Sequence, residues 1–292
     1  MVTFGLHLYT YTSRMDEKAL GIMPRLREIG FDGAEIPLIA QHLDLLDPEK
    51  VRSVLKDLEM GCVAGTGLSP EMDIISDEKE TRARGVAHLK RCIDITARMG
   101  GTLLAGALYA AFGRRPKKGR NSRQWEYSVR GVREAGRFAA QEGITLGLEP
   151  LNRYEHFFIN TAEDALALIK DINEPNVKLH LDTYHMNIEE KDFYTVIVNA
   201  GKNLCHVHCS ENDRGIPGSG HIDWDGLCKA LLDISYKGWL VIESFFEPIP
   251  EIADFTPIWR KLAPDADTLA IQGLVFLKKK LKTQGDDNDE IS

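Results

Sequence analysis

The chain has 292 residues, of which 43% are hydrophobic and 27% charged, an ordinary composition for a globular protein. Its net charge of −8 argues against a nucleic-acid partner, because binding phosphates requires a basic surface. No apolar run is long enough to predict a membrane span, and the first residues lack a signal-peptide pattern. The five cysteines show no paired CxxC spacing, which is typical of reduced thiols. We therefore expect a cytoplasmic protein with no nucleic-acid or membrane partner.

Apolar, β-branched runs alternate with helical patterns along almost the whole chain. The predicted strands are Val2–Leu8, Gly33–Leu38, Cys62–Leu68, Thr102–Leu108, Ile144–Leu151, Val177–Asp182, Leu204–Cys209 and Trp239–Ser244. The helices predicted to follow them are Asp16–Ile29, Pro48–Glu59, Glu78–Met99, Ser122–Gln141, Thr161–Ile172, Asp192–Asn199, Trp224–Ile234 and Asp265–Lys282. Asp47 before Pro48 is a typical helix start.

Eight strand–helix alternations predict an α/β protein with a parallel sheet closed as a (β/α)8 TIM barrel. An open doubly wound sheet is the alternative, but no GxGxxG motif follows the first strand. No linker or composition shift divides the chain, so residues 1–283 are predicted to form a single catalytic domain. Residues 284–292 (QGDDNDEIS) are polar and acidic, and we expect them to form a flexible tail.

The ends of the last four predicted strands carry side chains that are typical metal ligands. They are Glu149, Asp182, His208 and Glu243, each about one strand–helix unit apart. Barrels place their active sites at the C-terminal ends of the strands, so these side chains are expected to converge. Three carboxylates and one imidazole suit Mn²⁺ best, with Co²⁺ or Mg²⁺ as alternatives, whereas structural zinc prefers thiolates or more histidines. His206, two residues before His208, is predicted to be a hydrogen-bonded core histidine rather than a ligand.

Two of the predicted ligands are also candidates for acid–base chemistry. Glu149 and Glu243 come from strands separated by two others, so they can approach a bound molecule from opposite sides. A metal between them would stabilise the enediolate that forms when a carbon beside a carbonyl loses its proton. Return of the proton to the opposite face gives epimerisation, and return to the neighbouring carbon gives isomerisation. Glu155, His185 and Arg214 lie just beyond the ligands and could hold substrate hydroxyls.

The last two strand–helix loops bear on the type of substrate. Residues 211–221 (ENDRGIPGSGH) are glycine-rich and include Arg214, which leaves a phosphate cradle open as an alternative. Residues 245–255 (FFEPIPEIADF) contain no glycine or lysine, which favours a neutral, unphosphorylated sugar. The segment Phe245–Trp259 is too apolar for an ordinary exposed loop. We expect it to be covered by a neighbouring subunit or to form part of a substrate lid.

Four motifs resemble those of one family: GLEPLNRYE (147–155), LDTYHMNIEE (181–190), HVHCSENDRGIPGSG (206–220) and IESF (242–245). They are similar to the D-tagatose 3-epimerase family, which includes the D-psicose (D-allulose) and L-ribulose 3-epimerases and belongs to the xylose-isomerase-like barrels. The resemblance implies that Glu149, Asp182, His208 and Glu243 hold a divalent metal, usually Mn²⁺. It further implies that Glu149 and Glu243 form the acid–base pair, that Glu155, His185 and Arg214 contact the ketose, and that the protein is a homodimer or homotetramer.

The implied reaction is C3 epimerisation of a free ketohexose or ketopentose such as D-tagatose, D-fructose, D-psicose or L-ribulose. Two features depart from the family pattern: His7 replaces an aromatic or apolar residue, and the 109–127 loop is unusually basic. Both are expected near the far end of the sugar, which makes His7 a further candidate substrate-binding residue.

Four other functions are alternatives. A keto-sugar isomerase or an inosose dehydratase-type enzyme would use the same barrel and metal. A nuclease of the endonuclease IV type would need more histidines at early strand ends, where this chain has Glu35 and Thr66. A catalytically idle sugar-binding protein would not require two carboxylates beside a metal.

Overall fold

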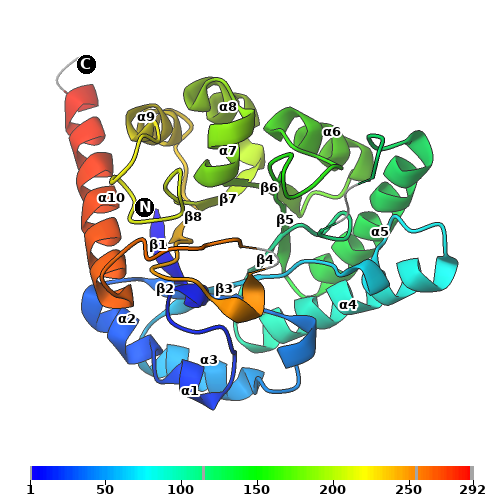
Figure 1. The fold of residues 1–292 in the computed structure, drawn as a ribbon, viewed down its shortest axis with the longest axis horizontal. Helices are drawn as coiled ribbons and strands as arrows, with labels where there is room; N and C mark the ends of the chain where they lie inside the picture. The colour runs from blue at the N-terminus through cyan, green and yellow to red at the C-terminus, as the bar shows by residue number, and fades with distance from the viewer. Residues whose placement is uncertain (1, 114–115, 254–255, 290–292) are drawn as a thin grey trace.

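In the computed structural model, the described residues are 2–113, 116–253 and 256–289. Eight parallel strands follow one another in chain order and close into a barrel that is surrounded by helices (Figure 1). The strands are β1 (Thr3–His7), β2 (Gly33–Pro37), β3 (Gly61–Gly65), β4 (Leu103–Gly106), β5 (Thr145–Leu148), β6 (Val177–Asp182), β7 (Leu204–His208) and β8 (Trp239–Ile242). The prediction of a single-domain TIM barrel is confirmed.

Helices cover the outside of the barrel and fill the connections between its strands. They are α1 (Glu17–Leu20), α2 (Met23–Ile29), α3 (Pro48–Asp57), α4 (Lys79–Arg98), α5 (Ser122–Gln141), α6 (Ala162–Ile172), α7 (Thr183–Glu189), α8 (Phe193–Ala200), α9 (Trp224–Asp233) and α10 (Ala266–Asp289). Short 3₁₀ turns add η1 (Leu8–Thr10), η2 (Ala40–His42), η3 (Pro70–Met72), η4 (Gly201–Asn203) and η5 (Pro250–Ile252).

The helices that follow β1 and β6 differ from the sequence prediction. The helix predicted over 16–29 is divided into α1 and α2, because Pro24 lacks an N–H and therefore occupies the first turn of a new helix. The connection after β6, where the first predicted helix began only at Asp192, contains α7, whose first turn is capped by the Asp182 side chain accepting the Tyr184 N–H. This cap orients the segment that carries His185.

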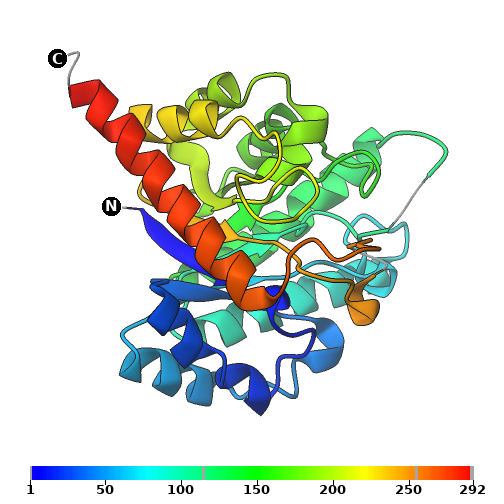
Figure 2. The same ribbon diagram turned by 60° about the vertical axis from the view of Figure 1, so that its left-hand side comes forward.

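The last helix is longer than its sequence pattern predicts. Figure 2 shows α10 lying diagonally across the outside of the barrel. It continues to Asp289, past Lys282, and so includes most of the segment predicted to be a tail. Residues 290–292 of that segment lie outside the described residues, and its flexibility stays a prediction. No helix in the described parts of the chain is both long and apolar enough to cross a membrane.

The lower end of the barrel interior is filled by one large ring that three glycines accommodate. Trp239, the first residue of β8, packs against Gly5, Gly33 and Gly61 at or near the starts of β1, β2 and β3. A Cβ added at Gly33 would stand 2.5 Å from the Trp239 ring and 2.3 Å from the Gly61 carbonyl oxygen. Gly33 therefore has no space for a larger side chain.

We expect Gly33→Ala to destabilise the protein by about 1–3 kcal/mol, because the added methyl must displace the indole or a neighbouring strand. Urea unfolding measures the difference. Gly119→Ala is the matched control, since a Cβ there meets no atom within 4 Å. Equal unfolding midpoints for the two variants would contradict this account of the barrel floor.

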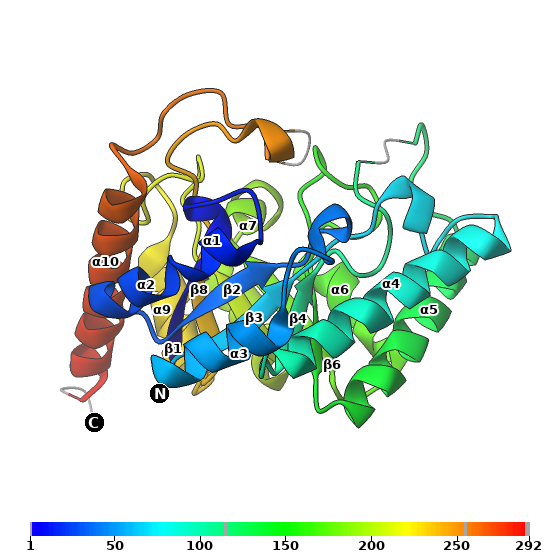
Figure 3. The same cartoon turned by 90° about the horizontal axis from the view of Figure 1, so that it is seen from below.

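The upper end of the barrel is covered by the connection from β8 to α10. In Figure 3 this connection (orange) arches over the upper ends of the strands. Ile252 and Thr256 from it line the cavity in the barrel mouth, whereas Trp259 is 77% exposed. Two residues of the segment therefore face the cavity, and its role as a substrate lid stays a prediction. Its contact with a second subunit stays a prediction, and residues 254–255 lie outside the described residues.

Candidate active site

A cavity of about 230 Å³ opens at the C-terminal ends of the barrel strands. It is lined by seven of the eight predicted site residues: His7, Glu149, Glu155, His185, His208, Arg214 and Glu243. The eighth, Asp182, is buried beside it, with 1% of its surface exposed. Phe112 from the 109–127 loop also lines the cavity, whereas Arg114 and Arg115 of its basic run lie outside the described residues.

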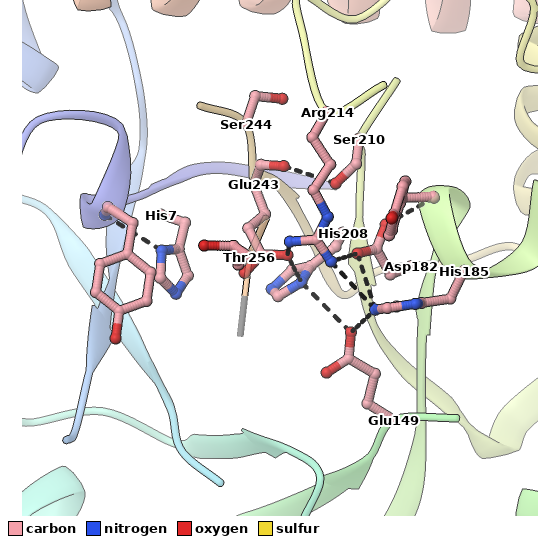
Figure 4. Close-up of polar contacts among 12 residues, drawn as sticks. His7, Glu149, Asp182, His185, His208, Ser210, Arg214, Glu243, Ser244 and Thr256 are labelled. Atoms are coloured by element: carbon pink, nitrogen blue, oxygen red, sulfur yellow. Dashed lines mark hydrogen bonds and ion pairs between the residues drawn. The ribbon is translucent and has the colours of Figure 1, made fainter. Parts of the chain in front are cut away.

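The four predicted metal ligands converge at one point. Donor atoms of Glu149, Asp182 and His208 all lie within 4.8 Å of one another. His208 Nδ1 is 3.3 Å from Glu243 Oε2 and 3.8 Å from Glu149 Oε1. Figure 4 shows these side chains reaching the same space from the ends of β5, β6, β7 and β8. Parallel strands end at one rim, and this explains the convergence.

Buried polar atoms at this point fit a divalent cation. Asp182 Oδ2 and His208 Nδ1 are buried and make no hydrogen bond within the described part of the chain. Buried polar groups in proteins normally have partners, so such atoms indicate a ligand. The donors are mainly carboxylate oxygens with one imidazole nitrogen, which suits a hard or borderline ion. The residues present therefore fit the predicted metal.

Asp182 and His185 owe their positions to local structure around α7. Asp182 Oδ1 accepts the Tyr184 N–H and caps the helix, so Oδ2 remains available on the side of the site. His185 Nδ1 accepts the backbone N–H of Asn152 at 3.1 Å. This contact leaves His185 Nε2 facing the cavity, 3.8 Å from Glu149 Oε1 and 3.2 Å from the Arg214 guanidinium.

Arg214 enters the site from a tight turn after β7. Its φ of 63° is in the left-handed region, an unusual conformation for a residue with a side chain that marks local strain. The guanidinium is buried, lies over the Tyr184 ring at 4.3 Å, and is 3.3 Å from Glu243 Oε2. Glu155, on the same side of the cavity, accepts a hydrogen bond from the Asn152 side chain at 3.0 Å.

The glycine-rich loop after β7 is organised around Glu211, which the sequence analysis did not identify. The buried Glu211 carboxylate accepts hydrogen bonds from the Gly218 and Ile222 backbone N–H groups and from the Trp224 ring N–H. The Glu211 carboxylate therefore already occupies the N–H donors that a bound phosphate would require. This arrangement supports the expectation of an unphosphorylated sugar over the phosphate cradle.

The two candidate acid–base residues have opposite electrostatic environments. Burial raises the pKa of Glu149 well above its usual value, and nearby Glu243 and Asp182 add to the effect. Burial also raises the pKa of Asp182, to about 7. Burial acts in the same direction on Glu243, but Arg214 and His208 outweigh it and hold the pKa of Glu243 well below its usual value. With the chain's own groups alone, these surroundings favour the ionised form of Glu243 and the protonated form of Glu149.

Glu35 is a second buried carboxylate whose place in the site was not predicted. It projects from β2 into the barrel, where its Oε2 lies 2.8 Å from His206 Nε2 and 2.9 Å from His208 Nε2. Burial opposes its ionisation, but the two imidazoles hold the pKa of Glu35 well below its usual value. The prediction that His206 is a hydrogen-bonded core histidine is confirmed. An acid inside the otherwise apolar run GAEIPL was the signal available in the sequence.

His7 and His185 both line the cavity and lie at opposite ends of the site in Figure 4. Its Nδ1 accepts the Tyr9 backbone N–H at 3.3 Å, which leaves Nε2 free to face other groups. Burial lowers the pKa of His7, which favours the neutral ring. The structure thus places His7 in the cavity, and its contact with a sugar stays a prediction.

A closed (β/α)8 barrel with carboxylates and imidazoles gathered at its C-terminal mouth has the form of an enzyme with a candidate metal site. Residues 23–280 match the family model of the xylose isomerase-like TIM barrel. A ketose 3-epimerase from Arthrobacter globiformis is 34% identical over 280 residues, covering 95% of this chain and 96% of that protein. An L-ribulose 3-epimerase from Methylomonas sp. (strain DH-1) is 34% identical over 86% of this chain and 87% of its own.

Solved structures agree with these relatives. A structure of L-ribulose 3-epimerase has a TM-score of 0.95 and 32% identity, with 100% of this chain and 98% of that chain covered. A D-allulose 3-epimerase from Methylomonas sp., solved in complex with D-allulose, has a TM-score of 0.91 and 32% identity, with 96% and 97% covered. The chain belongs to the xylose isomerase-like TIM barrels and, within them, to the ketose 3-epimerases, which are isomerases acting on sugars.

Proposed function

We propose that this protein catalyses metal-dependent C3 epimerisation of a free ketohexose or ketopentose, such as D-tagatose, D-fructose, D-psicose or L-ribulose. The observation that carries the proposal is that carboxylate oxygens of Glu149 and Glu243, which come from different strands of the barrel, both lie close to His208 Nδ1, at 3.8 and 3.3 Å. Relatives named as D-psicose and L-ribulose 3-epimerases support this class of substrate.

The metal site proposed here consists of Glu149, Asp182, His208 and Glu243, with Mn²⁺ as the preferred ion and Co²⁺ or Mg²⁺ as alternatives. A bound divalent cation would supply positive charge that stabilises the oxyanion developing on the sugar as C3 loses its proton. Asp182 Oδ2 and His208 Nδ1, which have no hydrogen-bond partner among the described residues, support this assignment.

The proton transfers are assigned to the two glutamates. Glu243, ionised beside Arg214, removes the C3 proton from one face of one epimer. Glu149, whose burial favours the protonated form, returns a proton to the opposite face. The other epimer reacts through the same steps in reverse, so each residue serves as base in one direction and acid in the other.

Four further residues are proposed to hold the sugar. Arg214, His185 and Glu155 stand together beside the acid–base pair, and the contacts of Asn152 with His185 and Glu155 fix their separation. His7 lies across the cavity and would contact the far end of the ketose. The neutral His7 ring has one hydrogen-bond donor and one acceptor. The Tyr9 backbone N–H already binds the acceptor, Nδ1, so the donor on Nε2 is the group left for the sugar.

Assembly and location are also proposals. We expect a homodimer or homotetramer in which the exposed Trp259 and its apolar neighbours face a second copy. All five cysteines are free thiols, which supports a reducing, cytoplasmic location.

Incubation with a panel of free ketoses and Mn²⁺ in D₂O tests the proposed function. Deuterium is expected at C3 only, together with formation of the C3 epimer, because proton removal and return both occur at that carbon. Deuterium at C1 or C2 would instead show an aldose–ketose isomerase, the runner-up function. Loss of water from an inosose with no change in any ketose would show a dehydratase.

A further inference from the structure

Glu35 joins two histidines through a single oxygen atom. Its Oε2 accepts from Nε2 of His206 at 2.8 Å and from Nε2 of His208 at 2.9 Å. All three side chains are buried, with 1% or less of Glu35 and His206 and 4% of His208 exposed. An ionised carboxylate only accepts hydrogen bonds, so each imidazole must carry a hydrogen on its Nε2.

This hydrogen-bond pattern determines which atom of His208 faces the cluster of carboxylates. With hydrogen on Nε2, the neutral ring has its lone pair on Nδ1, which lies 3.3 Å from Glu243 Oε2 and 3.8 Å from Glu149 Oε1. A rotated ring would turn carbon atoms toward both groups and break the bond to Glu35. The carboxylate therefore sets both the orientation of the ring and its tautomer.

We propose that Glu35 is a positioning residue for the divalent cation: it holds His208 with Nδ1 aimed at the site formed with Glu149, Asp182 and Glu243. This inference rests on the metal site of the proposed function. His206 serves as the second donor that keeps the buried carboxylate in place. In metal sites generally, removal of such an outer carboxylate weakens metal binding by about 10–100-fold.

A purely structural role is the competing explanation, because the same hydrogen bonds tie β2 to β7 across the barrel interior. The two roles predict different effects when one of these hydrogen bonds is removed. A cross-barrel tie involves His206 as much as His208, and its loss would lower stability without a specific effect on metal affinity. A positioning role concerns only the bond between Glu35 and His208.

The test compares Glu35→Gln with His206→Gln in metal-free protein titrated with Mn²⁺, using electron paramagnetic resonance to count the free ion. We expect about 10–100-fold weaker binding for Glu35→Gln. His206→Gln, which keeps an N–H donor beside Glu35, is expected to bind Mn²⁺ like the natural protein. Melting temperatures of the metal-free proteins are measured in parallel. Unchanged affinity in Glu35→Gln, or equal losses in both variants, would overturn the inference.

A measurement on the natural sequence covers the case in which Glu35→Gln does not fold. Nitrogen NMR of histidine-labelled, Mg²⁺-loaded protein reports which ring nitrogen carries hydrogen. We expect hydrogen on Nε2 of His208, and hydrogen on Nδ1 alone would refute the positioning role. A natural protein that binds neither Mn²⁺ nor Mg²⁺ would contradict the proposed function itself, an outcome distinct from failure of the inference about Glu35.

Discussion

Replacing Glu149 or Glu243 with glutamine is expected to abolish net C3 epimerisation in both directions. Glutamine keeps an oxygen atom and nearly the same shape but cannot accept a proton at the active pH. Loss of one positioned acid–base group costs about 10²–10⁴-fold in rate. The measurement is the rate of conversion of each epimer into the other, after metal content has been confirmed. Glu247→Gln is the matched control, because Glu247 is an exposed acid shortly after β8.

The two variants are expected to fail in different ways. Each epimer presents its C3 hydrogen to one face only, so the surviving carboxylate can still exchange that hydrogen in one of the two epimers. Deuterium washout from C3-labelled substrates, each epimer with each variant, reveals which one. If the two variants remove deuterium from different epimers, the result supports two bases that act on opposite faces of the sugar. If both variants exchange the same epimer, one carboxylate serves both faces and the two-base mechanism is wrong.

The second large effect is expected for His208→Ala. This variant removes the single imidazole in the oxygen-rich ligand set, so its affinity for Mn²⁺ should fall sharply. A ligand that binds only the folded state adds about 2.7 kcal/mol of stability at 100 times its Kd, and this increment should disappear. The measurement is the difference in melting temperature with and without Mn²⁺, which cancels the direct effect of losing the contact with Glu35.

His221→Ala is the control for this experiment, because His221 is exposed and lies in the loop after β7. It should show the same increase in melting temperature with Mn²⁺ as the natural protein. If His208→Ala also keeps that increase and its metal content, His208 is not a ligand.

Much of this active site could be predicted from local sequence patterns. Glu149, Asp182, His208 and Glu243 each follow an apolar β-prone run, and about one strand–helix unit separates each from the next. Once eight parallel strands are recognised, their C-terminal ends must share one rim. Convergence of these side chains then follows from the order of the elements, with no knowledge of individual contacts.

Other features depended on contacts that local patterns do not contain. Glu35 lies 171 positions before His206 in the sequence, yet their side chains are 2.8 Å apart. Similarly, Asn152 meets His185 through a backbone N–H, and Glu211 binds the backbone of its own loop. Hydrophobic periodicity and helix-start signals act over about ten residues, so they predict elements but not these pairs.

The sequence by itself therefore determined the (β/α)8 architecture, the rim on which the four ligand candidates stand, and the likeness to the ketose 3-epimerases. The tertiary structure decided which nitrogen of His208 faces the carboxylates, how Arg214 separates the pKa values of Glu149 and Glu243, and where His7 stands in the cavity. The physical reason is barrel closure. It brings side chains from distant strands into one buried volume, where low polarity and fixed distances set their hydrogen bonds and charges.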